Sequence, residues 1–275
     1  MTAAHDPGNN LVDELLTVAC QVAVEGGDVA AAGRTATALD IATKSSATDL
    51  VTVLDHTAED TIVGRLAALR PGDAVVGEEG THREGTSGVS WLIDPIDGTT
   101  NFVYRVPQWA TSVAASDAGG ALAGAVYVPT MGELFAAGRG RGATLNGEPI
   151  ACSGCTDVSL ALVATGFGYR PDDRRRQAAL VEHVIGSVRD IRRIGSAAID
   201  LCYAACGRVD AYYEAGLNPW DVAAGELIAR EAGCRSGDFT GGPPAANRLL
   251  VAAPSIFDDL VRLVSEAVTA EHQDE

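Results

Sequence analysis

Apolar residues recur along the chain at two spacings, and these spacings predict its helices and strands. From Leu11 to Val24 the apolar positions fall three and four residues apart, which predicts an amphipathic helix that ends at Gly26-Gly27. Similar spacing predicts further helices over 57–68, 177–188, 195–206, 222–231 and 256–268. Short apolar runs predict strands over 74–80, 89–93, 160–165, 191–194, 211–214 and 249–252, and a strand at the end of 41–53 that leads to Asp55.

The middle of the chain predicts an antiparallel meander. From Thr111 to Phe135 the pattern is strand-like, with turn residues at 117–120 and at 129–132. Asn146-Gly147 is the dipeptide that tight hairpins favour, because both positions accept a positive φ. We therefore expect consecutive strands joined by short turns in this region.

The two halves of the chain differ in pattern, which predicts two parts of one α/β fold. Residues 1–150 combine helices with the meander and predict an α+β half with a mixed or antiparallel sheet. Residues 151–275 alternate strands with helices, which is typical of an α/β arrangement with a second sheet. The boundary is expected in the stretch Pro149–Asp157.

Composition describes an ordinary globular chain with a strong negative charge. The 275 residues are 47% hydrophobic and 21% charged, which is enough apolar content to build a core. The formal net charge of -17 argues against direct binding of nucleic acid or of an anionic membrane surface. We find no apolar run that approaches transmembrane length and no signal pattern at residues 1–10. We therefore predict a cytoplasmic location.

The six cysteines do not predict a metal or redox centre. Cys152-Ser-Gly-Cys155 is a CxxC motif, but no second CxxC accompanies it. Cys202 and Cys206 are four residues apart in an apolar helical pattern, where small buried thiols are common. A zinc or redox role for Cys152 and Cys155 remains the minor alternative.

The stretch from Trp91 to Phe102 carries the strongest chemical signal. An apolar strand stops at Asp94, Pro95 restricts the turn, and Asp97 follows. Gly98 allows close backbone approach to a ligand, and either of the two threonines after it can cap a helix. Carboxylates bind Mg²⁺, and amides at a helix start bind phosphate, so a metal and a phosphate could meet here. Ordinary turn chemistry explains the two aspartates equally well when they are considered alone.

A second acidic strand end precedes this stretch. The run 74–77 ends at Glu78-Glu79. A solvated loop would explain these two acids, but strands that end at Glu78 and at Asp94 also predict one polar sheet edge with both carboxylates on it.

Two arginine clusters leave similar alternatives. Arg174-Arg175-Arg176 fits an exposed helix start better than an anion site, and Arg192-Arg193 fits either phosphate steering or surface solvation.

Several motifs in a fixed order resemble the inositol monophosphatase family, the Mg²⁺-dependent, lithium-sensitive sugar phosphatases. The matching segments are 44–46, 49–52 with Asp55, 77–79, 91–102, 195–198, 210–214 and 220–225. The resemblance extends from about Leu11 to Val264. It implies a layered α-β-α-β-α fold with the site between the two halves, and a homodimer.

By this resemblance, acidic residues hold two to three Mg²⁺ ions. The implied ligands of the first ion are Glu78, Asp94 and the backbone carbonyl of Ile96. The implied ligands of the second are Asp94, Asp97 and Asp221, with Asp94 bridging the two ions. A third, weaker ion uses Glu78 and mostly water. Lithium is expected to inhibit by occupying the second position.

The resemblance also implies the catalytic and substrate-binding residues. Thr99, with Asp55 behind it and Glu78 near it, would orient and help deprotonate a metal-bound water. No cysteine or histidine nucleophile is required, because phosphoryl transfer depends on positioning and electrostatics. The implied substrate contacts are Asp97, the amides of Gly98 and Thr99, the backbone around Ala197, Glu214 and Asp221.

The resemblance leaves the substrate and a second role open. The leading expectation is hydrolysis of inositol 1-phosphate or a similar polyol phosphate, because Glu214 can accept hydrogen bonds from ring hydroxyls. Histidinol phosphate, fructose 1,6-bisphosphate and phosphoadenosine phosphate are rival substrates on the same site. Some bacterial members are associated with the transcription machinery, so a regulatory protein-binding role, alongside catalysis or in place of it, is the alternative of a different class.

Overall fold

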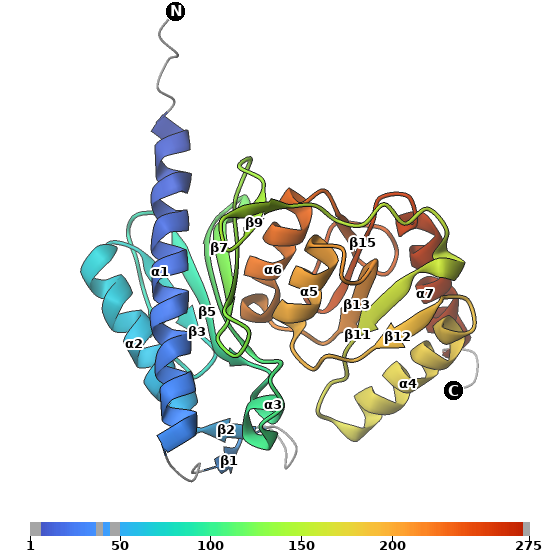
Figure 1. Ribbon diagram of the computed structural model, residues 1–275, viewed down its shortest axis with the longest axis horizontal. Coiled ribbons are helices and arrows are strands. Elements are labelled where there is room, and N and C mark those ends of the chain that lie inside the picture. Colours follow the sequence, from blue (N-terminus) through green and yellow to red (C-terminus); the bar gives the residue numbers. More distant parts are fainter. Residues whose placement is uncertain (1–6, 37–40, 45–49, 272–275) are drawn as a thin grey trace, which may run out of the picture.

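A computed structural model describes residues 7–36, 41–44 and 50–271, and its elements form stacked layers (Figure 1). The larger sheet has eight strands in the order β10-β9-β8-β7-β6-β5-β3-β4. All of its neighbouring strands are antiparallel except β3 and β5, which are parallel. The strands are β3 Ala74–Gly77, β4 His82–Arg83, β5 Ser90–Asp97, β6 Ala110–Asp117, β7 Gly120–Val128, β8 Glu133–Gly138, β9 Ala143–Leu145 and β10 Glu148–Ile150.

The second half of the chain forms a separate five-stranded sheet in the order β12-β11-β13-β15-β14. Its strands are β11 Leu162–Thr165, β12 Asp190–Arg192, β13 Ala211–Ala215, β14 Arg235–Gly237 and β15 Arg248–Ala252. Strand β11 is parallel to both of its neighbours, whereas β13, β15 and β14 are antiparallel. A short hairpin of β1 Ile41–Thr43 and β2 Leu50–Thr52 lies apart from both sheets.

Helices cover and separate the two sheets. The helices are α1 Pro7–Ala36, α2 Val53–Leu69, α3 Thr99–Tyr104, α4 Pro171–Ile185, α5 Ala197–Ala205, α6 Pro219–Glu231 and α7 Phe257–Glu271, with a 3₁₀ turn at Val158–Leu160. Helices α1 and α2 pack on one face of the large sheet, and α6 packs on its other face (Figure 1). Helix α5 lies beside α6 and contacts β13, while α7 contacts β15 and α4. This order confirms the expected α-β-α-β-α layers.

A buried apolar core fills each interface between layers. Trp91 and Ile93 on β5 face α1 and α2, and Tyr212 on β13 faces the middle layer of α5 and α6. Full burial of a large apolar side chain stabilises the fold by about 1.5–3 kcal/mol. The meander expected between Thr111 and Phe135 is confirmed as β6, β7 and β8, and the predicted hairpin turn has positive φ at Asn146 (51°) and Gly147 (83°).

The N-terminal helix is longer than the sequence predicts. Helix α1 continues through Gly26-Gly27 to Ala36, so the prediction that the two glycines end the helix was wrong. The reason is close packing. A Cβ on Gly26 would lie 2.6 Å from Cδ1 of Ile62 on α2, and a Cβ on Gly27 would lie 2.7 Å from Cδ1 of Tyr127 on β7. The glycines let α1 approach both neighbours.

Alanine substitutions at two helical glycines should therefore have opposite effects. In Gly27→Ala, the new Cβ meets the rigid Tyr127 ring, and we expect a loss of about 1–3 kcal/mol in the free energy of unfolding. In Gly64→Ala on α2, no atom lies within 4 Å of the new Cβ, and better helix propensity should add about 0.5–1 kcal/mol. Urea unfolding at neutral pH measures both values, and a destabilised Gly64→Ala would contradict this account of the packing.

The length of α1 also corrects the expectation that no apolar segment reaches transmembrane length. Among the described residues, one helix segment, Asn10–Thr35, is long and apolar enough by composition, with a mean hydropathy of 1.3. Its apolar side, including Leu15 and Val22, packs in the core between α2 and the large sheet. Core helices of globular proteins pass the same test, and the packing of α1 matches that class.

Candidate active site

The parallel pair β3 and β5 brings two acidic strand ends together. Gly77 pairs with Ile93, and the Glu78 N–H donates to the Ile93 carbonyl at 3.0 Å, so Glu78 and Asp94 lie at one sheet edge as expected. Glu59 on α2 holds the turn after β3, because its carboxylate accepts hydrogen bonds from the N–H groups of Glu79 (2.8 Å) and Thr81 (3.1 Å). The sequence pattern did not predict this positioning role of Glu59.

The sequence predicts that the strand stops at Asp94, but β5 continues to Asp97. The pairing with β6 shifts register between these two aspartates, which accommodates Pro95 because proline has no N–H for the ladder. The Ile96 N–H donates to Asp94 Oδ1 at 3.0 Å, which fixes that carboxylate inside the irregular segment. The chain turns at Gly98, whose φ is 93°. Gly98 itself precedes α3, so the expected threonine cap was wrong.

Asp97 is anchored by residues from the other half of the chain. Its Oδ2 accepts hydrogen bonds from the Ser196 hydroxyl and from the Ala198 N–H, both at 2.6 Å. Ser196 also caps α5 through the Ile199 N–H. The start of α5, with Ala197 in its first turn, therefore lies directly against Asp97. Helix N-termini favour a carboxylate at this position.

Asp55 lies in the first turn of α2, not at a strand end as predicted. Its Oδ2 accepts from the N–H (2.8 Å) and the hydroxyl (2.7 Å) of Thr52, which completes a capping box. Its Oδ1 lies 3.3 Å from Thr99 Oγ1, and the same hydroxyl lies 3.0 Å from the Ile96 carbonyl. Burial is the main cause that raises the pKa of Asp55, partly offset by the hydrogen bonds from Thr52.

Asp221 approaches the same site from the start of α6. Its Oδ2 accepts from the Asn218 N–H at 2.7 Å, so this aspartate caps its own helix. Burial raises the pKa of Asp221 well above its usual range, and the charge of Asp97 raises it further. In Figure 1, α5 and α6 lie side by side between the two sheets, so segments from both halves of the chain come together in this region.

The main electrostatic feature of the site is the burial of several acids close to one another, with their mutual repulsion as the second cause of their raised pKa values. Asp94 is 2% exposed, and burial followed by the charges of Glu78, Asp97 and Asp221 raises its pKa well above the ordinary value. Burial raises the pKa of Asp97 to about 6, although the hydrogen bonds from Ser196 and from the α5 backbone act to lower it. Like charges gathered in a buried site favour the binding of a cation.

The donor set suits a hard divalent cation, although it is not arranged in coordination geometry. Within the described ranges, no three His, Cys, Asp or Glu side chains are placed to hold a metal ion as they stand. The Lys44 ammonium instead lies 2.9 Å from Glu78 Oε1 and 2.6 Å from Glu79 Oε1, so it neutralises part of the acidic edge. Carboxylate and carbonyl oxygens are the ligands that Mg²⁺ prefers, and the four predicted acids with the Ile96 carbonyl supply them.

Glu214 lies at the end of β13, on the second sheet. The Tyr212 hydroxyl donates to Glu214 Oε2 at 2.7 Å, and burial raises the pKa of Glu214 to about 7. Burial also raises the pKa of Asp200 on α5 well above its usual range, followed by the charges of Glu214 and Asp97, whereas Arg193 lowers it. The guanidinium of Arg193 lies over the Phe167 ring at 6.0 Å.

The two arginine clusters now separate into different environments. Arg192 is exposed and pairs with Asp190 on its own strand, whereas Arg193 lies near Glu214 and Asp200. Arg175 and Arg176 pair with Asp172 and Asp173 in the first turn of α4 and are exposed, which fits a solvated helix start. No sequence pattern indicated a role for Asp200 or Gly166, because the residues they approach, Glu214 and Asp97, are distant from them in sequence.

Gly166 is required by the position of Glu214. A Cβ at Gly166 would lie 1.9 Å from Glu214 Oε2, so Gly166→Ala must displace that carboxylate. If Glu214 contacts substrate, we expect Gly166→Ala to raise KM by about tenfold, a loss of about 1.4 kcal/mol in binding. Gly168→Ala is the matched control, because its new Cβ lies 3.5 Å from the Asp173 Cβ, an ordinary contact. Equal KM values for the two variants would contradict a substrate contact by Glu214.

The cysteines form no disulfide: all six are free thiols. The Cys155 thiol lies 3.4 Å from the Asp157 carbonyl.

Comparisons with known proteins agree with this geometry. A model of the inositol monophosphatase family matches residues 11–269. The inositol-1-monophosphatase of Mycobacterium bovis is 47% identical over 230 residues, 79% of each chain, and Nus factor SuhB of Salmonella typhimurium is 42% identical over 234 residues, 83% of this chain and 86% of that protein. The crystal structure of extragenic suppressor protein suhB from Bartonella henselae has a TM-score of 0.86 at 33% identity, covering 90% of this chain and 97% of the other. The chain belongs to the inositol monophosphatase family.

Proposed function

We propose that this protein is a Mg²⁺-dependent phosphomonoesterase that hydrolyses inositol 1-phosphate or a similar polyol phosphate. The observation that carries the proposal is the buried position of Asp94 among Glu78, Asp97 and Asp221, next to the Thr99–Asp55 contact. A folded protein that keeps like charges together at a cost in stability gains from a cation that neutralises them. The family to which the chain belongs acts on phosphate esters of this class.

The proposed metal positions follow the carboxylates already described. Glu78, Asp94 and the Ile96 carbonyl would hold one ion, and Asp94, Asp97 and Asp221 a second, with a third, weaker ion at Glu78. Bound Mg²⁺ would supply a water of lowered pKa and would neutralise the charge that develops on the leaving oxygen. Asp94 would bridge the two main positions, which makes it the ligand with the largest expected effect.

The residues around the ions would position the substrate and move a proton. The Thr99 hydroxyl, 3.3 Å from Asp55 Oδ1, would take a proton from the attacking water as it gives its own proton to the buried Asp55 carboxylate, whose raised pKa favours acceptance. The amides of Gly98 and Thr99 would bind the phosphoryl oxygens, where backbone N–H groups stabilise the charge of the transition state.

Substrate hydroxyls would meet the second half of the chain. The Glu214 carboxylate, held by the Tyr212 hydroxyl, would accept hydrogen bonds from a polyol, and the backbone at Ala197 would add a further contact. Asp97 and Asp221 would lie beside the phosphate ester. Histidinol phosphate stays a rival, because a carboxylate also binds an ammonium group.

The experiment that tests this proposal is phosphate release with Mg²⁺ from a panel of phosphate esters. The panel contains inositol 1-phosphate, inositol 2-phosphate, fructose 1,6-bisphosphate, histidinol phosphate and phosphoadenosine phosphate. A kcat/KM that is highest for inositol 1-phosphate supports the proposal with Glu214 as the hydroxyl-binding residue. A highest value for histidinol phosphate keeps the metal chemistry and changes the substrate, and no release from any ester contradicts a phosphomonoesterase function.

Lithium should inhibit this activity in the millimolar range. The expected cause is occupation of the second metal position, whose ligands are Asp94, Asp97 and Asp221. The measurement is the initial rate at fixed Mg²⁺ with increasing LiCl, and NaCl at the same ionic strength is the control. Equal rates in the two salts would contradict a lithium-binding position at these three residues.

A regulatory protein-binding role is the second candidate, supported by the name Nus factor SuhB of relatives such as the Salmonella typhimurium protein. An Asp94→Asn variant that lacks turnover but still supplies the cellular function in a deletion strain would favour that role. Loss of both would favour catalysis.

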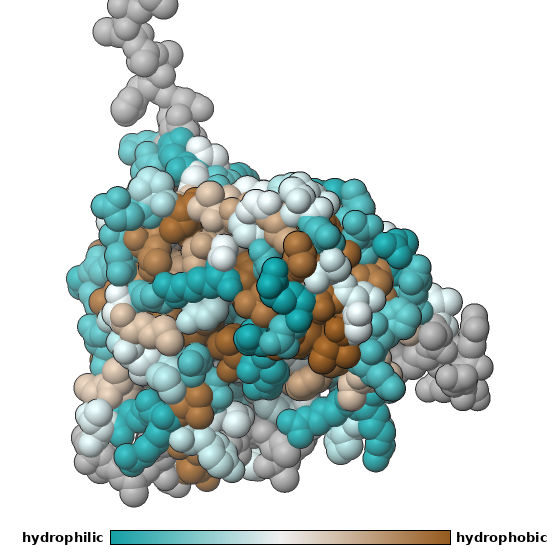
Figure 2. Space-filling view, turned by 45° about the vertical axis from the view of Figure 1, so that its right-hand side comes forward, coloured by the Kyte–Doolittle hydropathy of each residue, from teal (hydrophilic) through white to brown (hydrophobic). Residues whose placement is uncertain are grey.

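Exposed apolar side chains such as Tyr104 (74% exposed) and Val53 (56%), with the hydrophobic patches in Figure 2, support a homodimer as a further proposal. The cytoplasmic location stays a prediction.

A further inference from the structure

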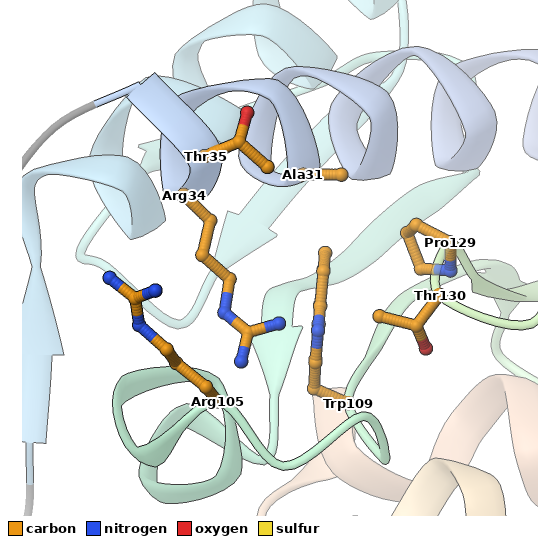
Figure 3. Close-up of a pocket in the computed structure, with 7 residues that line it drawn as sticks. All are labelled: Ala31, Arg34, Thr35, Arg105, Trp109, Pro129 and Thr130. Atoms are coloured by element: carbon orange, nitrogen blue, oxygen red, sulfur yellow. The ribbon is translucent and has the colours of Figure 1, made fainter.

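A small pocket outside the candidate active site has positive charge and unpaired hydrogen-bond donors. It lies where the end of α1, the residues after α3 and the turn after β7 meet, and it has a volume of about 270 Å³ (Figure 3). Its lining residues are Ala31, Arg34, Thr35, Arg105, Trp109, Pro129 and Thr130. A pocket of this size lies just below the usual range for small-molecule sites, about 300–1,000 Å³, and suits a small ion.

Two arginines supply the charge of the pocket. The Arg34 side chain extends from α1 toward the space between Arg105 and Trp109 (Figure 3). Its Nε donates to the Phe102 carbonyl at 2.9 Å. The guanidinium groups of Arg34 and Arg105 lie near each other (Figure 3), and burial, followed by the charge of Arg105, lowers the pKa of Arg34. No carboxylate among the described residues forms an ion pair with either one, although most arginines of this acidic chain have such a partner.

Two buried donors on residues that line this pocket have no acceptor among the described residues. Arg34 Nη2 and the Trp109 indole N–H are both buried, and neither has a hydrogen-bond partner within the described part of the chain. An unsatisfied buried donor costs about 1–3 kcal/mol, and more when it is charged. The two residues that carry these donors line one pocket beside a second arginine, and together the three residues supply a set of donors that suits an oxyanion.

The backbone at Arg105 adds an independent observation. Its φ is 62°, in the left-handed region where glycine is favoured, and a larger residue there costs about 1–3 kcal/mol. Helix α3 would end equally well with glycine at this position. An arginine in this strained conformation places a guanidinium at the mouth of the pocket, where it is exposed to solvent.

We propose that Arg34, Arg105 and Trp109 form a binding site for a small phosphate-type oxyanion, separate from the candidate active site. The guanidinium groups would donate to two or more of the oxygens, a geometry that suits phosphate, and the indole N–H would donate to another. Ala31 and Pro129 would cover the apolar rim. The proposal does not depend on the proposed hydrolase function, because the pocket uses none of the carboxylates assigned to metal binding.

The test is a titration of inorganic phosphate into the metal-free, full-length protein in chelator and low salt. Trp109 lines the pocket, so its fluorescence should change and saturate, and sulfate should compete. Arg105→Gly keeps the left-handed backbone and removes the charge, so the dissociation constant should rise by about tenfold or more. Arg105→Lys should bind more tightly than Arg105→Gly. Arg262→Gln, an exposed arginine on α7, is the matched control and should bind as wild type does.

A second readout keeps the proposal testable when fluorescence is silent. The ³¹P line width of phosphate should broaden with wild-type protein and less with Arg105→Gly or Arg34→Gln. Equal dissociation constants for wild type and Arg105→Gly would overturn the proposal, as would the absence of binding in both readouts. An Arg105→Gly variant that changes only the molar mass in light scattering, with no phosphate binding by wild type, would also overturn it and assign the arginines to contact between copies.

Discussion

Replacing Asp94 by asparagine is expected to lower kcat/KM for phosphate release by about a thousandfold or more, which corresponds to about 4 kcal/mol of transition-state stabilisation. Asp94 is the carboxylate that both proposed metal positions share, and asparagine keeps its shape while removing its charge. The burial of Asp94 among Glu78, Asp97 and Asp221 is the structural reason for this choice. Initial rates with Mg²⁺ measure the effect.

The stability of Asp94→Asn separates a lost ligand from a lost fold. The substitution removes a charge that like charges repel, so the metal-free variant should unfold at a temperature no lower than that of wild type. Asp190→Asn, at an exposed ion pair with Arg192, is the matched control and should keep normal activity. Near-normal turnover by Asp94→Asn in a folded protein would remove Asp94 from the metal site.

Replacing Asp73 by asparagine is expected to destabilise the fold by about 3 kcal/mol at neutral pH. Asp73 is 1% exposed, and its carboxylate accepts hydrogen bonds from Arg70 (2.8 Å), Ser87 (2.6 Å) and the Trp91 indole (2.9 Å). These bonds tie α2, the loop before β5 and β5 itself together. Urea unfolding of both proteins measures the difference, and Asp259→Asn, an exposed pair with Arg262, should change stability by less than about 1 kcal/mol.

The effect of Asp73→Asn should depend on pH in a defined direction. Burial raises the pKa of Asp73, but the hydrogen bonds from Arg70, Ser87 and Trp91 outweigh it, so the folded-state pKa is lowered. The stability that the charge supplies is therefore complete above the unfolded-state pKa near 3.9 and is lost as the pH falls through the folded-state value. The difference between the two proteins should shrink below about pH 4. A constant difference from pH 7 to pH 3 would contradict the role of the charge.

Local patterns predicted the parts of the fold that depend on neighbouring residues. The adjacent positions of Glu78 and Asp94, the meander and the Asn146-Gly147 hairpin follow from short-range signals, and the structure confirms them, although β5 continues past Asp94 to Asp97. The ends of helices were harder to predict from the sequence. Gly26-Gly27 look like a stop signal, and only contact with Ile62 and Tyr127 shows that close packing keeps them inside α1.

The candidate site shows the same division. Asp55 was identified through a resemblance of motifs, but its place in the first turn of α2 depends on the capping by Thr52. The contact of Ser196 with Asp97 joins residues 99 positions apart, and the space that Glu214 needs at Gly166 is also non-local. Single-sequence patterns carry no signal for such pairs, because the pairing depends on how the two sheets face each other.

The central claim is a phosphatase site that works only with a divalent cation. The most direct measurement is phosphate release from inositol 1-phosphate by chelator-treated protein as Mg²⁺ is added back, with Ca²⁺ as the comparison ion. The account predicts no release without Mg²⁺ and a saturable rise with it, absent in Asp94→Asn. Release that is independent of Mg²⁺, or the same in wild type and Asp94→Asn, would contradict the account.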